Sequence, residues 1–430
     1  MAHDEQRNVK IGMPKVYVTT NGCDEGQLKS MHVQQFFIKN GFAVTRDPTQ
    51  ADFVIFYACG LTNLSEKHSL VMIKRLQAQT KDTARLIVWG CLAKQNPKCL
   101  VGTYEGPLIG PRDISFFESL PGVTSIGIED VSANSLIPQE TGGMEEVCPK
   151  WAYDPITDVL QHIWKRTNSV RLPRRKGLFD ADSFFVRVAE GCTGNCTYCS
   201  ERPAWGRIKS RPIQKIVEDF KLGLQRGYNR FFLVAADLGS YGVDIGCNVV
   251  DLLRKLATID ERKNYRMILN QMNPGDLKKM LPELEEVLAS GRIEALGCQV
   301  ESGSDRILQL MGRKYTASDW RESMLRINRK FPFVRLSTHF MIGFPTESDQ
   351  DFEATLKLLD PPIFIDWAGF FFFSPRPTVY ASRLPEQVSE NVKEKRYKKT
   401  YRKYLFMYIL NVAIGNIRYI LEHRKYALDG

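Results

Sequence analysis

Short apolar runs rich in β-branched and aromatic residues alternate with segments of helical periodicity along most of this 430-residue chain. In the first hundred residues the runs are KVYVTT, ADFVIFYA and RLIVWG, and helical periodicity covers residues 27–39 and 62–79. Such alternation predicts a parallel sheet, because parallel strands need long crossover connections, which are usually helices. Residues 14–140 are therefore expected to form a doubly wound α/β domain.

A second and longer alternation begins at Phe184. Its strand candidates, in chain order, are FFVRVAE, RFFLVAAD, YRMILNQ, EALGCQVES, RLSTHFMIGFP and DWAGFFFF. Six strand–helix units predict a partial (β/α)6 barrel over residues 183–384, with its active site at the C-terminal ends of the strands. Residues 141–182 are expected to be a linker, and residues 385–430 a basic helical tail.

Composition and the N-terminal residues indicate the cellular location and the class of partner that we expect. No apolar run is long enough to cross a bilayer and the start, MAHDEQRNVK, is not a signal peptide, so we expect a cytoplasmic protein without membrane contact. Ten cysteines in a reducing compartment favour metal ligation or redox chemistry over disulfides. The formal net charge of +10 fits either an anionic partner, such as RNA or a phosphorylated metabolite, or an ordinary basic surface.

Three closely spaced cysteines follow the first strand of the second alternation. They are Cys192, Cys196 and Cys199. Thiolates at this spacing wrap one face of a [4Fe–4S] cluster and leave the fourth iron without a protein ligand. Such an iron chelates S-adenosylmethionine, and an electron from the cluster then cleaves the sulfonium to a 5′-deoxyadenosyl radical. Gly191 and Gly194 relax the loop, and Tyr198 is suited to pack against the adenine.

A second set of cysteines comes directly after the three predicted strands of the first alternation. They are Cys23, Cys59 and Cys91. The C-terminal ends of neighbouring parallel strands lie side by side, so these thiols are expected to converge although they are far apart in the sequence. Convergence predicts a second, auxiliary [4Fe–4S] cluster that also has an open iron.

Simpler interpretations of these thiols remain as alternatives. A zinc site would need a fourth ligand, and no further Cys or His lies near the first set. The second set would otherwise be three small buried hydrophobic residues. We expect structural roles for the remaining cysteines, which are Cys99, Cys148, Cys247 and Cys298. If the auxiliary cluster only transferred electrons, Cys99 would be the nearest candidate for its fourth ligand.

Two cysteine triads in this order resemble the radical S-adenosylmethionine methylthiotransferases. The resemblance continues in GR at 206–207, SRP at 210–212, LVAADLGSYGVD at 233–244, QMNP at 271–274, CQVESGSDRIL at 298–308, MGR at 311–313, IGFPTE at 342–347 and SPRPT at 374–378. It covers the chain from Lys15 to about Lys403. The barrel motifs look closest to the subgroup that methylthiolates threonylcarbamoyladenosine in tRNA.

The resemblance implies sulfur insertion at an unactivated C–H bond. The deoxyadenosyl radical would abstract a hydrogen atom, the carbon radical would take sulfur from the auxiliary cluster, and a second S-adenosylmethionine would supply a methyl group. An electron donor such as flavodoxin or ferredoxin is expected. Whether the product keeps a methyl group stays open, as does a binding protein with degenerate clusters.

Polar residues at the ends of the barrel strands are the further site candidates. The candidates for S-adenosylmethionine binding are Tyr198, Asp237, Tyr241, Glu301, Ser302, Gly303 and Arg211. Arg376 is the candidate for substrate binding, and His339 is expected to be a core or rim histidine.

The chain departs from the family pattern in two places. After the first cysteine the family usually carries an Asn and an Asp-Ser pair, where this chain has Gly26, Lys29 and Ser30. The family also normally ends in a small RNA-binding β-barrel, whereas the residues after Lys403 are expected to be helical. We therefore expect a nucleotide-like metabolite or a peptide as substrate, with tRNA as the alternative.

The basic stretch Lys393–Lys403 allows two interpretations. It either lies on phosphates or forms a helix that closes the barrel. Its interleaved aromatic residues, Tyr397, Tyr401 and Tyr404, have helical spacing that is equally typical of packing.

Overall fold

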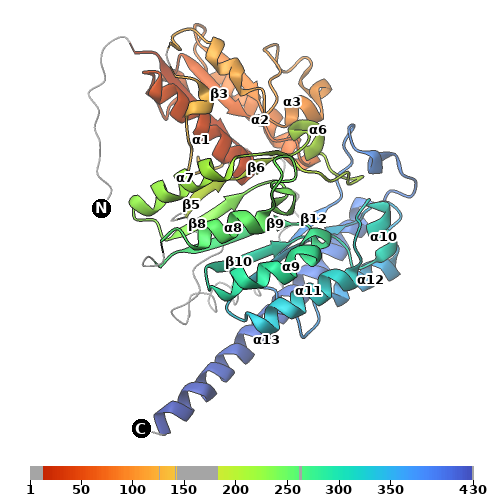
Figure 1. Cartoon of the computed structure of the whole chain (residues 1–430). Coiled ribbons are helices and arrows are strands. Elements are labelled where there is room, and N and C mark those ends of the chain that lie inside the picture. Colours follow the sequence, from red (N-terminus) through yellow and green to blue (C-terminus); the bar gives the residue numbers. More distant parts are fainter. Residues whose placement is uncertain (1–12, 125, 141, 143–182, 261–263, 429–430) are drawn as a thin grey trace.

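Two parallel sheets form the framework of the molecule (Figure 1). The computed structural model describes residues 13–124, 126–140, 142, 183–260 and 264–428. The expected linker, apart from Gly142, lies outside the described residues. The helix Asp24–Lys39 lies between the two sheets, with its Leu28 packed on the larger one, so the chain has the expected α/β class.

The N-terminal sheet has four parallel strands in the order β2-β1-β3-β4. They are β1 (Lys15–Thr20), β2 (Ala43–Val44), β3 (Phe53–Tyr57) and β4 (Arg85–Trp89). Three of them match the predicted strands, while the two-residue strand β2 was not predicted, because it is too short to show a pattern. Thr20, Tyr57 and Trp89 are register partners, so the three long strands end level with one another.

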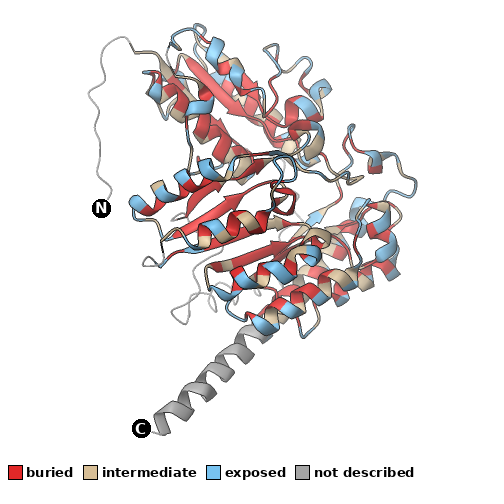
Figure 2. Cartoon of the chain, viewed as in Figure 1, coloured by how far each residue is buried: buried red, intermediate tan, exposed pale blue. Residues whose placement is uncertain are grey.

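Helices cover both faces of this sheet. The helical elements are α1 (Asp24–Lys39), α2 (Asn63–Gln79) and α3 (Leu92–Gln95), with 3-10 turns η1 (Pro48–Gln50), η2 (Pro97–Leu100), η3 (Ile114–Ser119) and η4 (Ile128–Asp130). Phe36 and Phe37 of α1 pack with Phe117 on one face, and Ile73 and Leu76 of α2 pack on the other. The strands are therefore buried on both sides, as Figure 2 shows, which explains their continuous apolar sequences.

The second sheet has six parallel strands that are neighbours in chain order, β5-β8-β9-β10-β11-β12. They are β5 (Phe184–Arg187), β8 (Arg230–Val234), β9 (Arg266–Met272), β10 (Ile293–Cys298), β11 (Arg335–Ile342) and β12 (Trp367–Phe372). A separate antiparallel pair is formed by β6 (Ala189–Glu190) and β7 (Lys209–Ser210), which flank the segment that carries Cys192, Cys196 and Cys199. Consecutive parallel order is the arrangement of the predicted partial barrel.

Side-chain caps start several of the helices in this half. They are α6 (Glu201–Trp205), α7 (Ile213–Gln225), α8 (Val249–Ala257), α9 (Pro274–Ala289), α10 (Asp305–Leu310), α11 (Ala317–Lys330), α12 (Asp349–Lys357) and α13 (Glu390–Leu428), with turns η6 (Leu238–Ser240) and η7 (Tyr380–Arg383). Asn248, Thr316 and Ser348 form reciprocal capping boxes that start α8, α11 and α12. No helix among the described residues combines the length and apolar character needed to cross a bilayer.

The first turns of α13 pack against the last strand of the barrel. Tyr397, Tyr401 and Tyr404 each contact the ring of Phe370 on β12, with centroids 6.5, 6.1 and 5.6 Å away. Lys393 is buried, and its ammonium donates to the carbonyl of Phe373 at 2.9 Å. The aromatic residues of the basic stretch therefore pack, and the helix closes the barrel.

Most of the cations in this stretch have internal acidic partners. The ion pairs are Lys393–Glu390, Arg396–Glu347, Lys398–Glu394, Lys399–Glu353 and Lys403–Asp360. A cation that is neutralised by a neighbouring carboxylate has little charge left to attract phosphate. The ion pairs therefore reduce the charge that this helix offers to phosphates.

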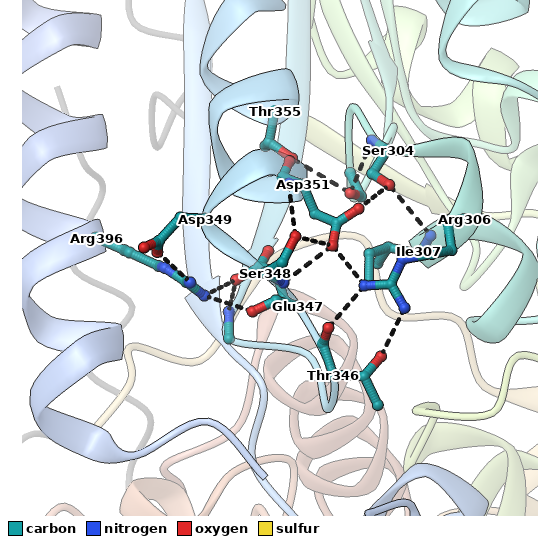
Figure 3. Close-up of polar contacts among 12 residues, drawn as sticks. Ser304, Arg306, Ile307, Thr346, Glu347, Ser348, Asp349, Asp351, Thr355 and Arg396 are labelled. Atoms are coloured by element: carbon teal, nitrogen blue, oxygen red, sulfur yellow. Dashed lines mark hydrogen bonds and ion pairs between the residues drawn. The ribbon is translucent and has the colours of Figure 1, made fainter. Parts of the chain in front are cut away.

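One buried polar network anchors α13 to the loop after β11 (Figure 3). The guanidinium of Arg396 donates to Glu347 and to Asp349, each at 2.7 Å. The side chains of Arg396 and Glu347 are only 8% and 0% exposed, so neither charge has an alternative partner in solvent. On the other side of the loop Asp351 receives Arg306 and Ser304. The loop is thereby fixed between two helices.

Removing the guanidinium should strongly destabilise the protein. We expect Arg396→Ala to lower the free energy of unfolding by about 3–5 kcal/mol, because it leaves the Glu347 carboxylate buried without its counter-ion. Lys395→Ala, on the exposed neighbouring position, is the matched control and should change it by less than about 0.5 kcal/mol. Chemical denaturation measures both values, and equal small effects would contradict the anchoring role.

Candidate active site

The loop that carries Cys192, Cys196 and Cys199 starts directly after β6. Gly191 has a φ of +71°, and a Cβ there would lie 2.6 Å from the carbonyl oxygens of Gly206 and Arg207. Only glycine fits this turn, which directs Cys192 out of the strand. All three cysteines are partly exposed at the C-terminal edge of the barrel.

Neighbouring barrel segments hold the loop in place. Thr197 receives a backbone hydrogen bond from Ala381 at 2.9 Å, and its own N–H and hydroxyl donate to the carbonyls of Met311 and Leu310. The Thr193 and Ser240 hydroxyls are 2.8 Å apart. The thiols are therefore positioned by contacts from three separate segments of the barrel.

The space between the thiols fits an iron–sulfur group. A Cβ at Gly194 would lie 3.6 Å from the sulfur of Cys192 and 3.7 Å from that of Cys196, so glycine keeps the space beside both sulfurs open. Burial raises the thiol pKa values of Cys192 and Cys199, while the backbone amides of Gly194 and Arg202 oppose part of this rise; such hydrogen bonds stabilise thiolate ligands. Burial nevertheless raises the pKa of Cys199 to about 12, with Glu201 adding to the shift. These thiols ionise readily only when a metal replaces the proton.

The second set of thiols lies at the level ends of β1, β3 and β4. Cys23 and Cys91 are the N-cap residues of α1 and α3, and Cys59 follows β3. Cys59 and Cys91 are buried, whereas the Cys23 residue is exposed. Burial first and Cys59 second raise the pKa of the Cys23 thiol. Burial, Cys59 and Cys23 likewise raise the pKa of Cys91, so the three thiols lie within electrostatic reach of one another.

The two cysteine loops are joined to each other directly. The hydroxyl of Ser200, next to Cys199, donates to the carbonyl of Leu61 at 3.3 Å. The amide of Gln95 in α3 donates to the carbonyl of Ser200 at 2.8 Å. Helix α6 packs on α3 at this point. The segments that follow Cys59, Cys91 and Cys199 therefore meet, and they bring both triads to one site.

Three of the predicted S-adenosylmethionine residues lie beside the first triad. Asp237 raises the pKa of Cys192, after burial, and Glu301 acts on Cys196 in the same way. Tyr198 is held by a hydrogen bond from Arg313. Asp237 and Glu301 therefore lie within electrostatic reach of the first triad, and Tyr198 within hydrogen-bonding reach of Cys196.

The other predicted residues have scaffold contacts. Tyr241 is fully buried and donates to the carbonyl of Arg211 at 2.8 Å, and Arg211 itself pairs with Asp219 at 2.9 Å. Ser302 is fully buried, and a Cβ at Gly303 would lie 2.3 Å from the carbonyl of Ala354. These residues shape the strand ends rather than present free polar groups.

Arg376 is also held inside the protein. It is 2% exposed and its guanidinium pairs with Glu66 and donates to Asn63 at 3.0 Å. Since Asn63 and Glu66 belong to α2, this contact ties the barrel to the N-terminal sheet. His339 stands between the rings of Trp367 and Phe371 on the opposite face of β12 from α13, as a rim histidine would.

Sequence reasoning missed two residues of the site. Arg313 pairs with Glu301 at 2.8 Å and lies 5.5 Å above the Tyr198 ring. Glu201 acts electrostatically on five of the six triad thiols, Cys23, Cys59, Cys91, Cys192 and Cys199. Arg313 was visible as part of MGR at 311–313, but its partners are not adjacent in sequence. Glu201 gave no signal, since a Glu in a short helix is unremarkable by composition.

The remaining cysteines occupy other surroundings. The thiol of Cys99 donates to the carbonyl of Asn96 at 3.0 Å, and Cys298 is a core residue. Cys247 is partly exposed against the barrel core, and Cys148 lies outside the described residues. Within the described ranges no three His, Cys, Asp or Glu side chains are arranged around a single metal ion. A cluster, unlike zinc, spreads its ligands over separate iron atoms.

Comparisons with known proteins match both halves of the chain. Residues 186–359 match the radical SAM superfamily, and residues 15–106 match Uncharacterized protein family UPF0004. The ribosomal protein uS12 methylthiotransferase RimO of Moorella thermoacetica is 30% identical, with 90% of this chain and 82% of the relative covered. The chain belongs to the radical S-adenosylmethionine methylthiotransferase family.

Other relatives of this chain carry related names. The probable threonylcarbamoyladenosine tRNA methylthiotransferase of Pyrococcus abyssi is 28% identical over 89% of this chain and 82% of its own length. Among solved structures, the radical S-adenosylmethionine methyltransferase TsrM of Kitasatospora setae has the same fold, with a TM-score of 0.54 at 14% identity, covering 86% of this chain and 77% of that one. Enzymes of the family use S-adenosylmethionine and two [4Fe–4S] clusters, which confirms the cofactors expected from the sequence.

One departure of this chain from the family pattern has a clear structural role. Lys29 is 2% exposed and its ammonium lies 2.6 Å from the carboxylate of Glu190, which also receives Arg187 at 3.1 Å. Although burial alone would raise it, Lys29 and Arg187 lower the pKa of Glu190 to about 2. His32 completes the cluster by donating from Nε2 to the carbonyl of Ile128 at 2.7 Å while Arg187 faces its Nδ1 at 3.3 Å. These buried charges join α1 to the strand that precedes Cys192.

The histidine in this cluster predicts a loss of stability in acid. Burial, Arg187 and Lys29 lower the pKa of His32 to about 3, so the folded protein keeps it neutral. Its contribution is fully present above the unfolded pKa of about 6.5 and decreases as the pH falls towards 3. Between pH 7.5 and 5 the free energy of unfolding should fall by about 2 kcal/mol through this residue.

Urea unfolding at several pH values measures this loss. His32→Gln keeps a neutral side chain and should flatten the curve between pH 6.5 and 5, above the range in which Glu190 titrates. Parallel curves for the two proteins would contradict the assignment.

Proposed function

We propose that this chain inserts sulfur, as a thiol or methylthio group, at an unactivated C–H carbon of its substrate. Cys192, Cys196 and Cys199 hold the cluster that activates S-adenosylmethionine. The other triad, Cys23, Cys59 and Cys91, holds the auxiliary cluster that carries the sulfur.

The meeting of the two cysteine loops is the observation that carries this proposal. Ser200 contacts the segments after Cys59 and Cys91 through Leu61 and Gln95. A substrate radical must take up its sulfur before it reacts elsewhere, so the radical source and the sulfur carrier need to share one site. The fixed junction of the two loops supplies that proximity. The electron-transfer alternative needs no such proximity to substrate.

The chain's own side chains have distinct tasks in this reaction. Tyr198, Asp237 and Glu301 line the position of S-adenosylmethionine, and Arg313 holds Tyr198 and Glu301 in place. Arg211, Tyr241, Ser302 and Gly303 shape the strand ends behind them. Arg376 keeps the two sheets together through Glu66, so its effect on substrate is indirect.

We further propose a substrate other than tRNA, either a peptide side chain or a nucleotide-like metabolite. Five cations of the Lys393–Lys403 stretch pair with internal carboxylates, so this helix offers phosphates little free charge. The relative from Moorella thermoacetica is named for a ribosomal protein, which supports the peptide option. The tRNA option rests on relatives such as that of Pyrococcus abyssi.

Iron content and S-adenosylmethionine cleavage test the two triads separately. The anaerobically reconstituted chain should bind about eight iron atoms, and replacing either triad by alanine should leave about four. Loss of the auxiliary triad should retain release of 5′-deoxyadenosine and abolish sulfur insertion, whereas loss of the other triad should abolish both. Cys99→Ala is the matched control and should keep all the iron. A loss of about half the iron on Cys99→Ala would instead favour the electron-transfer alternative.

Product analysis tests the substrate. The reconstituted chain, S-adenosylmethionine, sulfide and a reductant are incubated in parallel with total tRNA and with ribosomal-protein peptides. Mass spectrometry should detect added sulfur on a peptide and none on a tRNA nucleoside. A methylthiolated nucleoside would overturn the non-tRNA proposal and leave the cluster assignments intact.

A further inference from the structure

The last residue of β3, Tyr57, lies beneath the auxiliary thiols. It is 1% exposed, and its hydroxyl oxygen is 3.0 Å from the sulfur of Cys91. The other two thiols are also near, since burial first, and then Cys91, Cys23 and Cys59, raise the pKa of the phenol. The Tyr57 side chain therefore lies close to all three auxiliary thiols.

Three glycines surround the Tyr57 ring closely and provide the space that it occupies. A Cβ at Gly22, Gly26 or Gly90 would lie 3.0, 2.7 or 3.1 Å from atoms of the Tyr57 ring, too close for an ordinary contact. Below them, Trp89 packs edge-on against the same ring at a centroid distance of 4.9 Å. The hydroxyl is thus aimed at Cys91 by packing on several sides. Gly26 is one of the positions where the chain departs from the family pattern.

The direction of the hydrogen bond follows from the chemistry of the partner. A cysteine that binds iron is a thiolate, which can only accept, so the phenol O–H donates to it. Among the described residues the Tyr57 hydroxyl makes no other hydrogen bond. The whole donor capacity of this buried phenol is therefore directed at one ligand sulfur.

We infer that Tyr57 is a positioning residue that raises the reduction potential of the auxiliary cluster through the Cys91 sulfur. This inference rests on the proposed role of Cys91 as a cluster ligand. A hydrogen bond to a thiolate draws negative charge away from the iron, so an added electron is repelled less, and hydrogen bonds to sulfur are among the factors that set cluster potentials.

Sulfur insertion gives this tuning a purpose. When a carbon radical bonds to a sulfur atom, the new C–S bond contains the unpaired electron and one electron of a sulfur lone pair. The second electron of that lone pair would pass to the cluster held by the auxiliary triad. The hydrogen bond from Tyr57 would make the auxiliary cluster a better acceptor of that electron. It would thereby favour C–S bond formation over return of the abstracted hydrogen atom to the substrate radical.

Redox titration of the holoenzyme followed by electron paramagnetic resonance tests the inference. Tyr57→Phe keeps the ring and removes only the hydroxyl. The midpoint potential of the auxiliary cluster should shift to a more negative value, while that of the other cluster, with signals assigned from the two triad variants, stays unchanged. Tyr104→Phe is the matched control, because Tyr104 is a buried tyrosine of the same domain whose hydroxyl donates to the carbonyl of Leu86. It should shift neither potential.

A second variant keeps the test decisive if Tyr57→Phe binds less iron. Site-specific 3-fluorotyrosine at position 57 retains the hydroxyl and makes it a stronger donor, so the auxiliary potential should move to a more positive value. An unchanged auxiliary potential in a fully loaded Tyr57→Phe or 3-fluorotyrosine protein would overturn the inference. If the auxiliary triad variant instead loses no iron, the proposed function fails rather than the role of Tyr57.

Discussion

The ion pair between Lys29 and Glu190 fixes how the two halves of the molecule meet. Lys29 lies six residues after Cys23, and Glu190 lies two residues before Cys192, so this 2.6 Å contact connects the supports of both triads. Removing two charges from water costs several kcal/mol for each ion, and only close geometry with further partners offsets that loss. Arg187 and Arg112 provide such partners around Glu190. The junction of Ser200 with Leu61 and Gln95 depends on the sheets being held in this relation.

Much of the framework could be predicted because its signals are local. The strands at Lys15–Thr20 and Phe53–Tyr57 are continuous apolar runs between turn residues, and they lie where the sequence placed them. The convergence of Cys23, Cys59 and Cys91 followed from one rule about parallel strand ends. The family, the cofactors and the enzyme class are confirmed by the relatives.

The parts that escaped prediction depend on partners far away in the sequence. Arg313 acquires its role from Glu301 and from Tyr198, which lies 115 positions earlier in the chain. Motif residues such as Ser302 contact another helix rather than an open site, and the sequence does not distinguish these two uses of a polar residue. Net charge has a similar limit, because it does not tell which cations, such as Arg396, are paired with carboxylates that only the fold brings near.

The packing around Tyr57 also constrains how this site can change over generations. Gly22, Gly26 and Gly90 tolerate no larger side chain while the ring is present, and a smaller residue at position 57 would leave an unfilled space beneath the thiols. The side chain at position 57 and the absence of a side chain at position 26 therefore depend on each other. Replacing the tyrosine would remove the close contact at Gly26, whereas Gly90 would keep its φ of +107° and its 3.0 Å approach to the Ala58 carbonyl, so positions 26 and 57 should vary together among descendants.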